Sequence, residues 1–232
     1  MGLILQITTA ATDTVAAAAA ALPTEETLSL WDLTLKGGPI MVPIALCSVI
    51  AVYIIFERYF AIKKSSKSDP NFMNNIRDFI SNGNIDAARS LCKNTDSPIA
   101  RMVEKGVSRV GKPLGDIEKA IENVGNIEVV KMEKGLSLLA TVAGAAPMLG
   151  FLGTVTGMIK AFYNMSKAGK TIDISLLSGG MYEAMVTTVA GLIVGIFALV
   201  AYNLLAAMVE QVVFKMETTS IEFMDLLQEP AR

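Results

Sequence analysis

Three stretches without a charged residue constrain the fold of this chain more than any other feature. They cover residues 37–56, 135–159 and 184–209, and contain 20, 25 and 26 residues. A helix needs about 20 apolar residues to cross the hydrocarbon core of a bilayer. All three stretches meet that length, and the last two are long enough to tilt or to protrude. The sequence therefore predicts an all-α, polytopic membrane protein with three transmembrane helices.

Composition agrees with a membrane protein and excludes several functional classes. Hydrophobic residues make up 52% and charged residues only 18%, whereas soluble domains carry about a quarter charged residues. Histidine is absent, which removes His–metal sites and Ser–His or Cys–His catalytic units. A net charge of −2 gives no basic field for nucleic acid. We expect no enzyme activity, no metal and no cofactor, and no disulfide between Cys47 and Cys92.

Basic residues predict the orientation of the chain. The region from Arg58 to Lys134 holds 14 of the 20 Lys and Arg residues, and only Lys36 precedes the first span. By the positive-inside rule the middle region is cytoplasmic, the N-terminus lies outside and the C-terminus lies inside. Lys160, Lys167 and Lys170 conflict mildly with this orientation, because they lie between the second and third apolar stretches, on the side predicted to be exterior.

Residues that typically start or end helices divide the polar regions into short helices. Asp69-Pro70 and Ser97-Pro98 predict helix starts, Gly83 and Gly111 predict helix ends, and a helix from about Leu114 is expected to continue unbroken into the second span. The three predicted spans cover residues 37–60, 135–163 and 180–209. An exported N-terminal segment with a short amphipathic helix (1–36) precedes them, and a cytoplasmic C-terminal helix (210–232) follows them. A cytoplasmic helical region (61–134) joins the first two spans, and an exterior loop (164–179) joins the last two.

Small residues form a stripe on each of the last two spans. Such stripes let helix backbones approach closely in lipid, within one chain or between copies. Pro147 lies in mid-span and must free a backbone carbonyl near position 143, which neighbouring groups have to satisfy. The residues expected to mediate helix packing are Ala146, Pro147, Gly150, Gly153, Gly157, Gly191 and Gly195.

Few polar residues interrupt the last two spans, and three of them are candidates for a proton path. Thr154 and Thr188 are flanked by the small stripes, so each can border a narrow, partly polar lumen between assembled copies. Glu183 opens the third span; it is either an ordinary charge at headgroup level or a titratable group at the mouth of a proton path. No ionisable residue lies at the bilayer centre, so another chain would have to supply a proton carrier.

Several motifs in combination resemble the ExbB and TolQ proteins of the MotA/TolQ/ExbB proton channel family. Residues 36–44 (KGGPIMVPI) and Glu57-Arg58 resemble the start of these proteins, and residues 145–158 (AAPMLGFLGTVTGM) resemble their second-span signature. The remaining matching segments are 29–33 (SLWDL), Glu183-Ala184-Met185, Thr187-Thr188, Gly191-Leu192 and Tyr202-Asn203. The exported N-terminal extension makes the chain more similar to ExbB than to TolQ.

The resemblance implies a function that composition and periodicity do not. Family members form a pentameric ring in the bacterial inner membrane around a dimer of a single-span partner, ExbD-like or TolR-like, which carries a protonatable Asp. Proton flow then does work through a TonB-like protein on outer-membrane transport, or through the Tol–Pal system. By position, Thr154 and Thr188 match the pore threonines of the family, and Glu183 matches its third-span glutamate. Thr187, beside Thr188, departs from the family pattern, so both Thr187 and Thr188 are candidates to face the pore. A motility stator and a non-conducting membrane scaffold are the alternatives.

Overall fold

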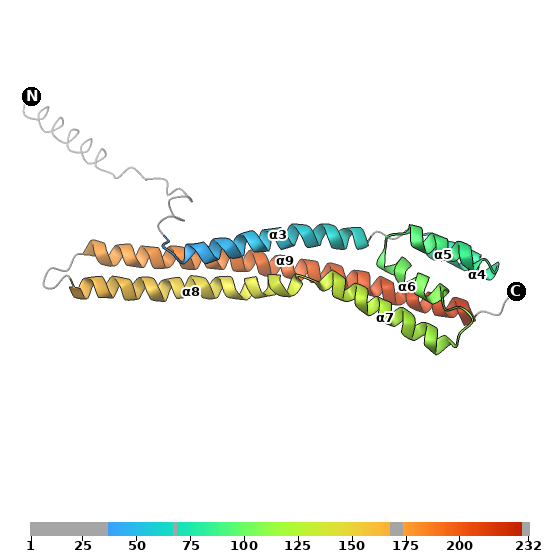
Figure 1. Ribbon diagram of the computed structural model, residues 1–232. Coiled ribbons are helices and arrows are strands. Elements are labelled where there is room, and N and C mark those ends of the chain that lie inside the picture. The colour runs from blue at the N-terminus through green and yellow to red at the C-terminus, as the bar shows by residue number, and fades with distance from the viewer. Residues whose placement is uncertain (1–36, 67–68, 168–173, 229–232) are drawn as a thin grey trace, which may run out of the picture. The chain divides into compact units, whose positions relative to one another are not determined.

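The computed structural model describes residues 37–66, 69–167 and 174–228, with side chains from 177 onward in the last range. Residues 1–36, for which the sequence predicts an exported segment with a short amphipathic helix, and residues 168–173 lie outside the described residues. Within the described part every regular element is a helix (Figure 1).

Three long helices carry the apolar stretches. They are α3 (Met41–Ser65), α8 (Leu136–Lys167) and α9 (Ile174–Gln228), and each is long and apolar enough to cross a membrane. The 55 residues of α9 correspond to about 80 Å at 1.5 Å per residue. Because a hydrocarbon core is about 30 Å thick, much of α9 extends beyond the membrane. The predicted class, an all-α protein with three transmembrane helices, is confirmed.

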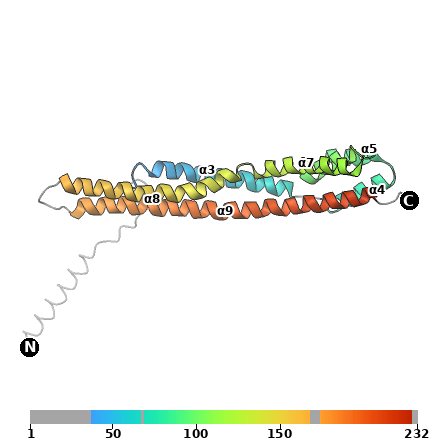
Figure 2. The ribbon, with the colours of Figure 1, turned by 90° about the horizontal axis from the view of Figure 1, so that it is seen from below.

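Helices α8 and α9 lie side by side and are joined by their small residues (Figures 1 and 2). A Cβ added at Gly191 would lie 2.5 Å from the Ala146 carbonyl oxygen and 2.9 Å from the Gly150 Cα atom. A Cβ at Gly195 would overlap Pro147 and lie 3.1 Å from the Ala143 carbonyl oxygen. The backbone of α9 therefore lies directly against α8, including the region where Pro147 frees a carbonyl.

The helix expected to run from Leu114 through the second span is interrupted, so that prediction was wrong. Helix α7 (Leu114–Glu133) ends before Lys134 and α8 begins at Leu136. Gly135 has a φ of +85°, the left-handed conformation that commonly ends helices. The first span packs on this break, since the Nη1 atom of Arg58 donates to the Lys131 carbonyl at 3.2 Å.

Short helices form the region between α3 and α7. They are α4 (Phe72–Ser81), α5 (Ile85–Asn94) and α6 (Pro98–Val107). The Ser97 hydroxyl accepts from the Ala100 N–H at 3.1 Å, as the Ser-Pro start predicts. Helix α4 begins two residues after Pro70, because Asp69 instead accepts from the Asn71 N–H at 2.9 Å.

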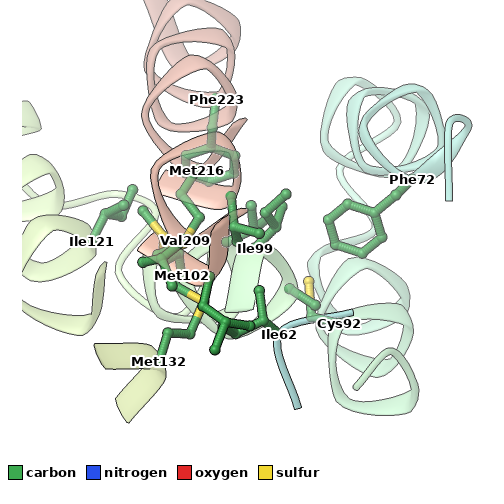
Figure 3. Packing of buried hydrophobic residues seen from close by; sticks show 14 of the residues in the cluster. Ile62, Phe72, Cys92, Ile99, Met102, Ile121, Met132, Val209, Met216 and Phe223 are labelled. Atoms are coloured by element: carbon green, nitrogen blue, oxygen red, sulfur yellow. The ribbon is translucent and has the colours of Figure 1, made fainter. Parts of the chain in front are cut away.

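One apolar core joins these short helices to α3, α7 and α9. Figure 3 shows its side chains, which converge from all six elements: Ile62, Phe72, Cys92, Ile99, Met102, Ile121, Met132, Val209, Met216 and Phe223. Phe223 near the end of α9 is fully buried. The part of α9 beyond the apolar span therefore packs on the short helices. The described helix reaches Gln228, and residues 229–232 of the predicted C-terminal helix 210–232 lie outside the described residues.

Both long helices extend into the segment 164–179, which the sequence predicts as an exterior loop. Helix α8 continues to Lys167 and α9 already begins at Ile174. The helical segments 164–167 and 174–179 mix polar, small and apolar residues, a composition that a solvated helix end also tolerates. Charge-free length alone therefore marks the apolar span and not the ends of the helix.

Cys92 is predicted to be chemically inert in the folded protein. Burial, and secondarily the nearby Glu104 charge, raise the pKa of its thiol to about 12. At pH 8 only about one thiol in ten thousand is then the reactive thiolate. In a Cys47→Ser background, iodoacetamide should label Cys92 in SDS and not in the folded protein, measured by intact mass. Equal labelling rates in the two states would contradict the buried position.

Candidate functional site: paired threonines and a glutamate between the spans

Thr154 of α8 and Thr188 of α9 face each other in the middle of the helix pair. Their hydroxyl oxygens are 3.1 Å apart. Thr188 Oγ1 also lies 3.0 Å from the Gly150 carbonyl oxygen of α8, and Thr154 Oγ1 lies 2.7 Å from the Phe151 carbonyl oxygen of its own helix. Because a hydroxyl has one proton, each donates either to its carbonyl or across the pair. Both side chains are only half-buried. Two hydroxyls thus meet in a charge-free stretch and retain an accessible side.

Thr187 occupies a different position from its neighbour. It is 1% exposed and donates to the Ala184 carbonyl at 2.8 Å. A Cβ at Gly153 would overlap its hydroxyl, and a Cβ at Gly37 would lie 3.5 Å from its methyl group. Thr187 therefore fills the contact between α9, α8 and the turn before α3. Of the two adjacent threonines, Thr188 is the more accessible to solvent.

Glu183 lies one helical turn before Thr187 and has a lysine partner. The Nζ atom of Lys160 on α8 lies 3.1 Å from Glu183 Oε2. The Glu183 side chain is 22% exposed and that of Lys160 is 61% exposed. In the sequence, Lys160 is visible only as a positive charge that conflicts with the predicted orientation, and its pairing with Glu183 is not predicted. The signal was available: Lys160 is the first charge after the second apolar stretch, and Glu183 is the last before the third.

The candidate residues divide into two groups on different sides of the α8–α9 contact. Successive helical residues are separated by about 100° around the axis, so Thr156 points roughly opposite to Thr154. Thr156, Lys160, Glu183 and Thr187 line a cavity of about 220 Å³ beside the beginning of α3, and neither Thr154 nor Thr188 lines it. The structure thus brings Thr154 and Thr188 together but does not bring Glu183 to them.

Outside the apolar stretches, a chain of charged groups links α3, α6 and α7. Glu128 of α7 is almost fully buried, and its two oxygens accept from Arg101 at 2.6 Å and from Lys131 at 2.7 Å. Burial alone would raise the pKa of Glu128, but the hydrogen bonds from Arg101 and Lys131 outweigh it and hold the pKa below its usual range. Arg101 also binds Asp96, which binds Lys64 at the end of α3. The network therefore ties the first span to α7.

This network predicts acid-sensitive stability. A lowered pKa contributes stability that is complete above the ordinary Glu pKa of about 4.3 and is lost as the pH falls through the lowered value. Because Arg101 and Lys131 are partly exposed, we expect Glu128→Gln to cost about 1–2 kcal/mol at pH 7. Thermal unfolding followed by circular dichroism should show this deficit shrinking below pH 4. Glu122→Gln, at an exposed position of the same helix, is the control, and an equal effect there would contradict the assignment.

No group of His, Cys, Asp and Glu side chains that could hold a metal occurs among the residues that the structure describes. The fold and the paired hydroxyls instead define a class: a multi-pass α-helical membrane protein whose second and third spans place polar groups, but no charge, at mid-membrane. Hydroxyls at this position can accept and donate hydrogen bonds, and they cannot titrate.

Comparison with known proteins identifies the family. A model described as the MotA/TolQ/ExbB proton channel family matches residues 94–218, more than half of the chain. The chain belongs to this family. The match contains the threonine pair and Glu183.

Several relatives are named as ExbB proteins. The ExbB-like 1 protein of Synechocystis sp. is 29% identical over 188 residues, which cover 80% of this chain and 74% of that protein. The biopolymer transport protein ExbB of Neisseria meningitidis is 25% identical over 189 residues, which cover 73% and 84%. The biopolymer transport protein ExbB of Xanthomonas campestris is 31% identical over 116 residues, which cover 50% and 46%. The predicted relationship, most similar to ExbB, is confirmed.

Proposed function

We propose that this chain is the ring-forming inner-membrane subunit of a motor driven by the proton-motive force. In this proposal it assembles with an ExbD-like single-span partner, and a TonB-like protein carries the work to outer-membrane transport. The observation that carries the proposal is the hydroxyl pair of Thr154 and Thr188. Family membership and the absence of any ionisable residue at mid-span support it.

The paired hydroxyls suit a partner that carries a titratable carboxylate. An ionised Asp in a low-dielectric site needs hydrogen-bond donors, whereas a protonated Asp lies beside an apolar wall at little cost. Thr154 and Thr188 supply hydroxyls at one depth, which would turn from the Phe151 and Gly150 carbonyls to donate to a charged Asp. Apolar side chains of α8 and α9 surround them. In the proposed cycle, the partner Asp binds a hydroxyl pair while charged and moves across the apolar surface while protonated.

Orientation and location belong to the same proposal. The chain is a multi-pass membrane protein, and we place it in the bacterial inner membrane with the N-terminus in the periplasm and the C-terminus in the cytoplasm. The concentration of basic residues between the first two spans supports this orientation. The small helices and the charge network around Glu128 would then lie in the cytoplasm.

Exposed apolar side chains in the cytoplasmic region support assembly with further copies, with a pentamer as the proposed ring. Val130, Phe214 and Ile221 are 68%, 70% and 63% exposed. Val130 and Phe214 line a cavity of about 920 Å³ between α7 and α9, and Ile221 lines one of about 410 Å³ beside it. Large apolar side chains outside the bilayer favour a covering partner. Lipid is expected to cover the corresponding apolar faces within the membrane.

Complementation tests this function and distinguishes it from a Tol–Pal role and from a motility stator. The chain and a single-span partner of the ExbD type are expressed in a strain that lacks its own ExbB and TolQ. We expect partner-dependent uptake of a ferric siderophore. Restored detergent resistance without uptake would favour a Tol–Pal role, and restored motility would favour a stator. Expression of both proteins at normal levels without any of these activities would contradict a motor function.

A further inference from the structure

The Glu183 carboxylate of α9 meets groups from two other elements. Its Oε2 atom accepts from Lys160 of α8 at 3.1 Å. Its Oε1 atom lies so close to the Gly38 backbone, in the turn before α3, that a Cβ there would overlap it. Gly38 has a φ of +68°, a conformation that glycine adopts readily and that other residues rarely adopt. The turn is thus shaped to admit the carboxylate.

Lys160 is the charged group that orients the Glu183 side chain. The cavity of about 220 Å³ around the pair is lined on its α3 side by uncharged residues of the turn before that helix, namely Gly37, Pro39 and Ile40. Among the described residues that line it, Lys160 and Glu183 are the charged groups. The hydroxyls of Thr156 and Thr187 donate to carbonyls of their own helices. Neither hydroxyl therefore competes with Lys160 for the carboxylate.

We propose that Lys160 is a positioning residue: it holds the Glu183 carboxylate on the Gly37–Gly38 turn, so that this ion pair ties the beginning of the first span to α8 and α9. The inference rests on the proposed function and adds to it a residue outside the expected site. Glu183 in this arrangement acts as a fixed partner of Lys160 on the α3 side of the bundle. The threonine pair lies on the other side of the α8–α9 contact and is separate from it.

A consequence of this arrangement is mechanical coupling between the three spans. Any relative sliding of α8 and α9 at their outer ends has to break the charge-assisted hydrogen bond at 3.1 Å or carry α3 along with it. The pair therefore fixes the register of α8 and α9 at the end where the partner would meet the exterior. Its loss leaves the small-residue contacts further along the helices in place, so the fold is expected to survive.

Substitution of Lys160 tests the proposal in the complex with the single-span partner. We expect Lys160→Met to lower siderophore uptake by up to about fivefold, the upper range for an ion pair with one exposed partner, with the mass of the complex unchanged. Lys160→Arg should recover at least half of the activity. Lys167→Met is the matched control, because Lys167 lies on the same helix and packs over the Tyr163 ring at 4.7 Å. Uptake by Lys160→Met at the wild-type rate would overturn the proposal.

A charge exchange separates the pair from a requirement for either residue alone. If the pair positions the helices, Lys160→Glu combined with Glu183→Lys should be more active than either single change. A double variant that is assembled but no more active than the singles would contradict the proposal. Wild-type protein is measured in parallel to test the proposed function. If the wild type shows no partner-dependent uptake, the motor function is rejected. If the wild type and Lys160→Met are equally active, only the role of Lys160 is rejected.

Discussion

Replacing both Thr154 and Thr188 by valine is expected to abolish most proton-coupled activity while the complex still assembles. Valine keeps the shape of threonine, so the helix contact remains filled. The lost hydrogen bonds between the two helices are worth only about 0.6 kcal/mol each in a bilayer. A charged partner Asp would lose its hydroxyl donors, and an unsatisfied ionised group in an apolar site costs far more. Proton flux into proteoliposomes that contain the complex measures the effect, with an expected loss of at least tenfold.

Thr141→Val is the matched control for the threonine pair. Thr141 lies on α8, is exposed and donates to its own helix at Ser137 with a distance of 2.9 Å. Its loss should leave proton flux within about twofold of wild type. Full activity of the double valine variant, or an equal loss in Thr141→Val, would remove the threonine pair from the proton path.

Gly191→Val is expected to prevent α8 and α9 from packing, the largest structural effect of any single change considered. A Cβ at this position would meet the Ala146 carbonyl oxygen at 2.5 Å and the Gly150 nitrogen at 3.1 Å. These are backbone atoms, so the two helices must separate to accommodate the side chain. Overpacking of this kind costs about 1–3 kcal/mol or more. We expect a sharp fall in folded yield and in the thermal midpoint of protein extracted in mild detergent.

Gly144→Val provides the comparison on the neighbouring helix. A Cβ at Gly144 meets no atom within 4 Å, so the same added side chain has room. Its thermal midpoint should stay close to that of the wild type. If Gly191→Val unfolds at the same temperature as Gly144→Val, the close approach of the two backbones is not what holds the helices together.

The sequence was sufficient for features with a local signature. Long charge-free stretches report the membrane helices directly, and the stripe of Ala146, Gly150, Gly153 and Gly157 reports the buried face of α8. The Ser97-Pro98 start and the Gly83 end also follow from backbone chemistry that neighbouring residues determine. Each of these patterns depends on spacing within one helix or turn.

Features that depend on distant partners escaped sequence reasoning. Gly135 was counted in the second apolar stretch, but its positive φ and the packing of Arg58 against it make it the break between α7 and α8. Lys160 and Glu183 are 23 positions apart, and Arg101 and Glu128 are 27 apart. Nothing in the local pattern pairs them, because their contact depends on how separate helices pack. Thr187 and Thr188 likewise differ only through the neighbours that each one meets.

The central claim is that several copies of this chain surround fewer copies of a single-span partner, and native mass spectrometry of the detergent-extracted complex tests it most directly. The chain would be expressed with and without an ExbD-like partner. The proposal predicts a ring, expected to be a pentamer, that retains a smaller number of partner chains. A monomer or dimer of unchanged mass in the presence of the partner would contradict the motor and leave the glycine stripes as packing within a membrane scaffold.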